Sequence, residues 1–525
     1  MNGYGESQLR KTPSFGSSLT LREMGLAEQG ARRNGRGSQG TFSEKTPLTG
    51  EPEVPPAINA TLLTTILAVT IGSSFQFGYG TGVMNNSEEV IMGYFLDQGK
   101  EYTILQWGIT VSMYGAGGLL GAVIGPKVIG RFVGRKTTLL INNVFVFLSS
   151  ILIAYGQQWW VLALGRVFIG VVAGVATAVV PTYLSEISPI AIRGAVGTMH
   201  QLGITVGILV SQALSTGSLH LLGSKDKWQW LFLVPVVASS VQLLILPFMP
   251  ESPSYLFREV GPTAARESLT RLQSPDVVDM YMDLIETELG MEQDSKQLTI
   301  GVVDLFRERS LRKQLVVGVV VQLMMQLSGI DAVFYYSTSV FYQAGVADAE
   351  LATTLLGVIN VIITVFAVRV MDSAGRKTLL TYSWMGMCTS FATLTLSFVF
   401  KPSVPYMDQV AVVAMTGIII FFAFGPGCIA WFLIAEIFPL SARDTAMAVG
   451  ITINWVANWA VAFTFPLLLE ALQPWTFSIF AGLTGFFLFF TTKYVPETKG
   501  RTVAEVTQVF ETMPSPQAIC GPCCQ

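Results

Sequence analysis

Five side-chain amides lie inside long apolar stretches of this 525-residue chain, at Gln201, Gln326, Asn360, Asn454 and Asn458. A polar side chain in an apolar segment is costly unless it has a hydrogen-bonding partner. An amide both donates and accepts hydrogen bonds, and the indole of Trp431 could add apolar surface and one N–H donor. The set therefore suits the binding of a small polar solute, although a lone amide is as often only a hydrogen bond between helices, worth about 0.6 kcal/mol.

The chemistry indicated is recognition without bond-making. The sequence contains no visible nucleophile–base set, metal-ligand cluster or phosphate-binding loop, so we expect no enzyme activity, no metal and no cofactor. The net charge is −3, which lacks the basic excess of a nucleic-acid surface, so we expect no nucleic-acid partner.

The elements that must position these amides are membrane helices. Charged residues make up 13% of the chain and hydrophobic residues 51%, whereas a soluble domain carries about 25% charged residues. A helix needs about 20 apolar residues to cross a bilayer. Twelve segments come close to this length: 58–79, 106–126, 138–155, 159–180, 200–218, 229–248, 314–336, 351–371, 378–399, 409–434, 446–468 and 474–494. The predicted fold class is an all-α membrane protein with twelve transmembrane helices.

Basic residues in the short loops predict the orientation, because they favour the cytoplasmic side. Nine fall in one set of loops and four in the alternate set. We therefore expect a multi-pass protein of the plasma membrane with both termini in the cytoplasm. The chain then divides into a disordered cytoplasmic tail, a six-helix half, a cytoplasmic helical linker, a second six-helix half and a cytoplasmic tail, at 1–56, 57–249, 250–313, 314–495 and 496–525. In the linker, an apolar face is expected from Leu269, Leu272, Val277, Met280, Leu284 and Leu289.

Three charged motifs occur twice, in the same order, at offsets of 241 to 250 residues. They are Gly134-Arg135-Lys136 with Gly375-Arg376-Lys377, Glu186-Ile187-Ser188-Pro189 with Glu436-Ile437-Phe438-Pro439, and Pro250-Glu251-Ser252 with Pro496-Glu497-Thr498. The repetition predicts two six-helix halves in parallel duplication. Transporter halves of this type enclose a site near the midplane and expose it to one side at a time.

The repeated charges could form a latch that holds the cytoplasmic side shut. Its members are Arg135, Glu186, Arg193, Glu251, Arg376, Glu436, Arg443 and Glu497. We expect pairs across the two halves that break when the halves part. The alternative is that these residues only anchor the orientation, since a single exposed pair is worth less than about 1 kcal/mol.

The chain resembles the sugar porters of the major facilitator superfamily, and within them the facilitative glucose transporters of animals. The matching strings include Phe77-Gly78-Tyr79, Pro250-Glu251-Ser252-Pro253, Gln326-Leu327-Ser328-Gly329-Ile330, Ala332-Val333-Phe334-Tyr335-Tyr336-Ser337, Gly425-Pro426-Gly427 and Pro496-Glu497-Thr498-Lys499-Gly500-Arg501. The resemblance covers about residues 60–505. It implies the superfamily fold, a hexose substrate in a lipid membrane and no chemical step on the sugar. It leaves the oligomeric state open and implies that a monomer suffices for transport.

The resemblance also assigns roles to residues. The expected substrate-binding residues are Gln201, Ile204, Ile208, Gln326, Asp331, Asn360, Trp431, Asn454 and Asn458. The expected gating residues, of the outer gate and of a hinge in the tenth span, are Asn85, Tyr335, Tyr336, Gly425, Pro426 and Gly427.

Several positions depart from the family pattern. Met325 stands where the family usually has a glutamine, Asp331 where it usually has an asparagine, and Ala423 where mammalian glucose transporters carry a glutamate. Glucose, fructose or both therefore remain open as substrates. Gly80 stands where proton-coupled relatives carry an aspartate, which favours facilitated diffusion. The alternatives are a proton–sugar symporter that uses Asp331 and a non-transporting sugar sensor.

Two modifications are expected as open alternatives. Asn85-Asn86-Ser87 is a glycosylation sequon on the outer side. The tail cysteines Cys520, Cys523 and Cys524 are candidates for palmitoylation. His200, next to Gln201, is expected to be a packed residue rather than a proton carrier.

Overall fold

The computed structural model describes residues 58–125, 130–189, 192–296, 300–501 and 503–512. The predicted tail 1–56 and the cysteines Cys520, Cys523 and Cys524 lie outside these residues. The regular structure of the described part is helical, as the sequence predicts.

The first half contains six membrane-spanning units. They are α2 (Ala60–Val69) continued by the π-helical turn η1 (Thr70–Ser74) and α3 (Phe75–Gly82), then α5 (Ile104–Ile124), α7 (Arg135–Tyr155), α8 (Trp159–Ile187), α9 (Arg193–Ser215), and α10 (Trp228–Leu231) followed by α11 (Val234–Ile245) and η5 (Leu246–Phe248). Two short helices, α4 (Glu88–Asp97) and α6 (Gly130–Val133), connect the spans.

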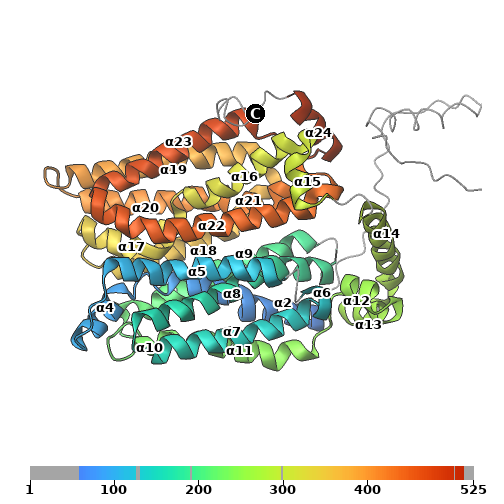
Figure 1. Cartoon of the computed structure of the whole chain (residues 1–525), viewed down its shortest axis with the longest axis horizontal. Helices are drawn as coiled ribbons and strands as arrows, with labels where there is room; N and C mark the ends of the chain where they lie inside the picture. The colour runs from blue at the N-terminus through green and yellow to red at the C-terminus, as the bar shows by residue number, and fades with distance from the viewer. Residues whose placement is uncertain (1–57, 126–129, 190–191, 297–299, 502, 513–525) are drawn as a thin grey trace, which may run out of the picture. The chain divides into compact units, whose positions relative to one another are not determined.

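The second half repeats this plan. Its helices are α16 (Arg312–Leu327), α17 (Ile330–Ala344), α18 (Ala349–Ser373), α19 (Arg376–Phe400), α20 (Met407–Phe424), α21 (Pro426–Ile437), α22 (Leu440–Leu472) and α23 (Thr476–Tyr494). Between the halves lie α12 (Pro253–Glu259), α13 (Pro262–Leu272), α14 (Val278–Lys296) and α15 (Val302–Arg307), and α24 (Val503–Thr512) follows the last span. In Figure 1 the first half runs from blue to green and the second from yellow to red.

Ten helical stretches in the described part are long and apolar enough to cross a membrane. One of them, Ser441–Tyr494, contains both the eleventh and the twelfth predicted spans. The fifth predicted span, α9, is not among the ten, and it carries polar side chains such as Gln201, Thr205 and Gln212. A transmembrane helix of this polarity must present those side chains to other protein groups or to a cavity, because lipid offers them no partner.

Two spans are broken where the sequence places glycine. The seventh span divides at Gly329, whose φ of +86° is strained for residues with a side chain. The tenth divides at Gly425, between α20 and α21, with φ −129° and ψ −87°. The predicted interruption by Gly425, Pro426 and Gly427 is therefore present, and it turns one span into two helices.

Close packing within the first half depends on small residues. α5 and α8 cross where a Cβ on Gly174 would overlap the carbonyl oxygen of Gly118, and one on Gly170 would overlap that of Tyr114. In lipid the helices gain little from burying apolar surface, so close contact through glycine supplies much of their attraction.

A second row of glycines on α5 faces the other half. A Cβ on Gly115 would lie 2.7 Å from Asn458 Oδ1, and one on Gly118 would meet the ring of Trp455. α5 and α22 are therefore in close contact, and α9 likewise packs against α18. These two pairs form the seam between the halves.

The linker helices carry their own small core. Leu269 of α13 and Tyr281 and Ile285 of α14 are buried together, with Val277 between the helices. The expectation that Met280 shares this face is wrong, because its side chain is 43% exposed. The α14 helix turns Tyr281 and Met282 inward instead.

We predict that Gly174→Ala destabilises the protein by about 1–3 kcal/mol, because the new methyl group meets backbone atoms of α5 that cannot rotate away. Thermal unfolding of the purified protein in detergent should show a fall of several degrees in the midpoint.

Gly482→Ala in α23 is the matched control, since no atom lies within 4 Å of the added Cβ. Its midpoint should stay the same or rise slightly. Equal shifts for the two variants would contradict the assignment of α5–α8 as a backbone-to-backbone contact.

Candidate functional site

A cavity lies between the two halves, and both contribute to its wall. Its lining residues are Phe77, Thr81, Gln201, Ile204, Thr205, Ile208, Met325, Gln326, Ile330, Asp331, Phe334, Tyr335, Asn360, Thr364, Phe422, Ala423, Gly427, Cys428, Trp431, Asn454, Trp455 and Asn458. The nine residues predicted to bind substrate are all among them. The cavity thus brings together side chains from α3, α9, α16, α17, α18, α20, α21 and α22.

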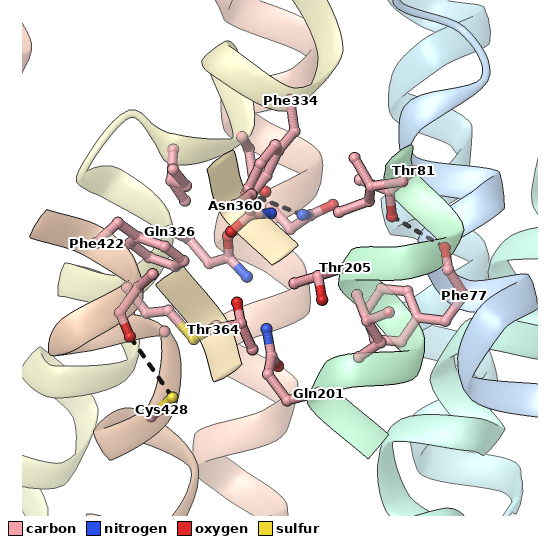
Figure 2. Close-up of a pocket in the computed structure, with 18 of the residues that line it drawn as sticks. Phe77, Thr81, Gln201, Thr205, Gln326, Phe334, Asn360, Thr364, Phe422 and Cys428 are labelled. Carbon is pink, nitrogen blue, oxygen red and sulfur yellow. Dashed lines mark hydrogen bonds between the residues drawn. The ribbon is translucent and has the colours of Figure 1, made fainter. Parts of the chain in front are cut away.

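The first half supplies one face of the cavity mainly through α9. Gln201, Ile204, Thr205 and Ile208 have the i, i+3, i+4, i+7 spacing of a single helix face. In Figure 2 the side chains of Gln201 and Thr205 point toward Thr364 and Gln326 of the second half. One stripe of α9 is therefore turned to the cavity.

The second half supplies a chain of hydrogen-bonded amides. Gln326 Nε2 donates to Asn454 Oδ1 at 2.8 Å, and Asn454 Nδ2 donates to Gln322 Oε1 at 2.9 Å. Asn454 Nδ2 also lies 3.4 Å from the sulfur of Met325, the residue that replaces the family's usual glutamine. These contacts hold the amides in fixed orientations.

Three buried amide atoms on the cavity wall have no hydrogen-bonding partner among the described residues. They are Gln326 Oε1, Asn360 Nδ2 and Asn458 Oδ1. An unpaired buried polar atom costs about 1–3 kcal/mol, so a ligand that pairs with all three would recover that cost. Two acceptors and one donor fit a molecule with several hydroxyl groups, each of which both donates and accepts.

Aromatic rings close one part of the wall. Phe77 lies 5.8 Å from Trp455 between ring centroids, and Tyr114 lies 6.1 Å from Trp455 and 6.5 Å from Tyr335. Phe77 and Tyr114 belong to the first half, whereas Trp455 and Tyr335 belong to the second. The cluster gives the cavity apolar surface and joins the halves at its edge.

Several lining residues lie outside the predicted site. Thr205 and Thr364 stand one helical turn from Gln201 and Asn360 respectively, so helix periodicity from the predicted amides could have found them. Phe77 and Trp455 carry no such signal, because an aromatic residue in an apolar span is most often core or lipid-facing. Their cavity position follows only from how α3 and α22 meet.

The helix ends beyond this cluster are joined across the halves by hydrogen bonds, and we call this the Asn85 end. Asn85 Nδ2 donates to Phe334 O at 2.9 Å and to Ser337 Oγ at 2.7 Å, and its Oδ1 accepts from Thr338 N at 3.0 Å. Thr216 and Thr354 hydroxyls are 2.6 Å apart. The halves are therefore fastened together at this end.

The structure places Asn85, Tyr335 and Tyr336 differently at this end, and their part in gating stays a prediction. Asn85 is fully buried and its amide is occupied by these bonds, so the sequon is not accessible to a glycan in this conformation. Tyr336 does not line the cavity; its hydroxyl donates to Ala462 O at 2.8 Å, and its ring packs on Phe465. Tyr335 faces the cavity, and Tyr336 lies within the second half.

At the opposite end, which we call the linker end because α12 and α13 lie there, the repeated motifs build the same arrangement twice. In the first half, Arg135 pairs with Glu186 at 2.9 Å, and Glu251 Oε1 accepts from the backbone N–H groups of Arg135 and Lys136. Ser252 Oγ donates to the other oxygen of Glu186.

In the second half, Arg376 pairs with Glu436 at 3.1 Å, and Glu497 Oε1 accepts from Arg376 N at 2.7 Å. Thr498 takes the place of Ser252. Glu251 and Glu497 thus cap the N-termini of α7 and α19, where a carboxylate is favoured.

These contacts change the expected latch. Both ion pairs join helices of the same half, not helices of different halves. Arg193 and Arg443 each have a buried Nε without a hydrogen-bonding partner among the described residues. The charged motifs therefore bind helix ends into each half in this conformation.

His200 is held by a hydrogen bond of 2.8 Å between its Nδ1 and Ser74 Oγ, which is the packed role expected for it. In the described part of the chain, no group of three or more His, Cys, Asp or Glu residues is placed to hold a metal ion.

Comparison with known proteins agrees with this geometry. The model of the family described as "Sugar (and other) transporter" matches residues 65–510. The chain belongs to this family.

Solute carrier family 2, facilitated glucose transporter member 3 of Rattus norvegicus is 39% identical over 86% of this chain and 94% of its own length. Facilitated glucose transporter member 4 of Homo sapiens is 37% identical over 89% of this chain and 94% of its own length. Among solved structures, the inward-open conformation of the xylose transporter XylE from E. coli aligns with a TM-score of 0.71 and 26% identity, covering 85% of this chain and 99% of that chain. The fold is accordingly the twelve-helix fold of the major facilitator superfamily.

One further contact at the Asn85 end is sensitive to pH. Ser339 Oγ donates to Glu88 Oε2 at 2.5 Å, which joins α17 to α4 across the halves. Burial raises the pKa of the Glu88 carboxyl above its ordinary range, the neighbouring charge of Glu89 adds to this, and the hydrogen bond from Ser339 lowers it. Opening this end would hydrate Glu88 and return its pKa toward the ordinary value.

We predict that alkaline pH on this side favours opening. Glu88 binds its proton more tightly when this end is closed than when it is open. Protonation of Glu88 therefore stabilises the closed end fully below the ordinary pKa of a glutamate, and this stabilisation is lost as the pH rises through the raised pKa. Glu88→Gln should weaken this dependence, and what remains is expected from Glu350 of α18, whose carboxylate accepts from Gly217 N across the same end. The readout is labelling of the cavity thiol of Cys428 by an impermeant maleimide applied from the Asn85 side, resolved by peptide mass spectrometry.

Glu101→Gln, at an exposed carboxylate of the same end, is the control and should retain the dependence. Dividing the rate of Cys428 labelling in wild type by the rate in Glu88→Gln at each pH removes the intrinsic pH dependence of thiol labelling. A ratio that does not change with pH would contradict the role of Glu88.

Proposed function

We propose that this chain is a facilitative hexose transporter that works by alternating access. The observation that carries the proposal is the cavity between the halves, where Gln326, Asn360 and Asn458 each present an unpaired amide atom. A hexose has hydroxyl groups around its rim and two apolar faces, so it can pair with these atoms and lie against Trp431 or Phe77. The relatives named as facilitated glucose transporters support the same substrate class.

The conformation fits one stage of the cycle. The two halves are fastened at the Asn85 end by Asn85, Thr216 and Glu88, and the likeness to inward-open XylE supports an opening at the linker end. We place the Asn85 end outside the cell and the linker end, with both termini, in the cytoplasm of a plasma-membrane protein. Closing the linker end would bring Arg193 and Arg443, with their unpaired Nε atoms, toward new partners.

The division of the chain follows from this cycle. Residues 57–249 and 314–495 are proposed as the two moving halves, 250–313 as the cytoplasmic linker, and 1–56 and 496–525 as cytoplasmic tails. The repeated Arg–Glu pairs within each half support rigid-body movement, because they tie together the helix ends that must move as one unit. The complete cavity belongs to one chain, so a monomer suffices.

The site favours diffusion without proton coupling. α3 carries no carboxylate, and Gly80 occupies the position of the coupling acid in proton-linked relatives. The carbonyl of Gly80 instead accepts a hydrogen bond from Arg166 Nη1. With no acid facing Arg166 from α3, binding and release of a proton there cannot be linked to sugar binding.

We predict that purified protein in proteoliposomes equilibrates D-glucose down its gradient, and that an imposed proton gradient does not drive accumulation above equilibrium. Gln326→Leu and Asn360→Leu should each lower the initial rate at subsaturating glucose by about tenfold, the effect of losing about 1.4 kcal/mol of hydrogen bonding.

Gln409→Leu, an exposed amide on α20, is the control and should transport at the wild-type rate. Failure of the wild type to exchange any monosaccharide across the vesicle membrane would refute the proposal that the chain is a sugar transporter. Accumulation of glucose above equilibrium under a proton gradient would refute the proposal that transport is uncoupled from protons.

A further inference from the structure

Asp331 is the one charged side chain among the described residues that line the cavity. It is 6% exposed and lies on the second residue of α17, directly after the break at Gly329. Asn458 Nδ2 donates to its Oδ2 at 2.9 Å. No hydrogen bond to its other oxygen is found among the described residues, so one side of the carboxylate is left for a ligand.

None of the described residues that line the cavity is a cation that could neutralise this charge. Arg166 of α8, a buried cation outside this lining, lies over the ring of Tyr114, 4.6 Å from its centroid, and donates to Gly80 O. The other titratable groups among the described lining residues are the phenol of Tyr335 and the thiol of Cys428, while Tyr114 packs on Tyr335 and His200 is bonded to Ser74. Asp331 therefore faces the cavity as an acceptor without a positive partner.

The chemistry of this group differs from that of the amides around it. A neutral amide both donates and accepts, whereas a carboxylate only accepts, and its hydrogen bonds to a cationic donor are about twice as strong as neutral ones. Water-poor surroundings strengthen the attraction further. A single carboxylate cannot satisfy Ca²⁺, which takes six to eight oxygen ligands, but it suits one ammonium group.

We infer that the cavity takes amino-deoxy hexoses in their protonated form, with the ammonium group on the free side of the Asp331 carboxylate and the remaining hydroxyls on Gln326, Asn360 and Asn458. This inference rests on the proposed function as a hexose carrier. Neutral hexoses bind the same cavity by donating a hydroxyl to Asp331, with a weaker bond.

The experiment measures inhibition of labelled D-glucose uptake into proteoliposomes over a series of pH values from mildly acidic to mildly alkaline, so that the carboxylate and the ammonium group are both charged over part of the series. The competitors are 2-amino-2-deoxy-D-glucose, 6-amino-6-deoxy-D-glucose and unlabelled D-glucose. Wild type, Asp331→Asn and Asp408→Asn are compared, the last being a carboxylate at the start of α20 that does not line the cavity. In each protein the inhibition constant for glucose is divided by the inhibition constant for the amino sugar. The inhibition constant for glucose serves by itself as the control for folding of each variant.

For at least one amino sugar, the ratio in wild type and Asp408→Asn should exceed that in Asp331→Asn by about tenfold, and labelled amino sugar should enter the vesicles. Equal ratios for wild type and Asp331→Asn with both amino sugars would overturn the inference. This is also the result expected if Asp331 is protonated in the cavity.

A second measurement separates this inference from the proposed function. Thermal unfolding of the purified proteins is followed with each amino sugar, without any transport. Stabilisation by an amino sugar in wild type that is lost in Asp331→Asn supports the cation site even if no glucose flux is found. Glucose flux without such stabilisation supports the carrier and removes the cation site.

Discussion

A polar group inside a membrane protein has to find its partner within the protein, because the lipid supplies none. Over most of this chain that requirement is met. Gln242 bonds to Ser73 and to Asn143, and Tyr79 bonds to the carbonyl of Leu231. Around the central cavity it is met only in part, since amides tied to one another on one side keep an unpaired atom on the other. Other buried atoms without a partner, such as Trp107 Nε1 and Gln314 Oε1, lie elsewhere in the described part, so the proposal of a binding site rests on the cavity together with its amides.

Alternating access requires that the two halves be rigid and that the contacts between them be exchangeable. Rigidity comes from backbone contacts, such as Gly174 against Gly118, and from carboxylates that cap α7 and α19. Exchangeable contacts are the hydrogen bonds at the Asn85 end. They are made by neutral side chains and by the carboxylates of Glu88 and Glu350, each weak enough to be replaced by water when that end opens. The breaks at Gly329 and Gly425 divide the seventh and the tenth span into two helices each.

Three departures from the family pattern, Met325, Asp331 and Ala423, line the cavity. Met325 replaces an amide, and its sulfur meets Asn454, so the loss removes a polar atom from the cavity wall without leaving Asn454 unpartnered. Asp331 adds a charge in a place where a neutral amide is usual. Relative to the family pattern, the cavity has one amide fewer and one carboxylate more, and this difference is the basis of the amino-sugar inference.

The sequence by itself determined the helices and the duplication, because hydrophobic length and repeated motifs are local signals. Buried amides together with the family resemblance gave nine residues that all line the cavity, and their binding of substrate stays a prediction. It also predicted the interruption at Gly425, since glycine and proline act on the backbone where they stand, but the break at Gly329 came only from the structure. Only the tertiary structure decided which groups meet. It placed Asn85 in a buried bond network, directed Tyr336 away from the cavity, and paired Arg135 and Arg376 within their own halves. It also brought Phe77 and Trp455 to the cavity wall. These outcomes depend on how distant helices pack, and helix packing is fixed by the shape of whole surfaces, which no short pattern in the chain contains.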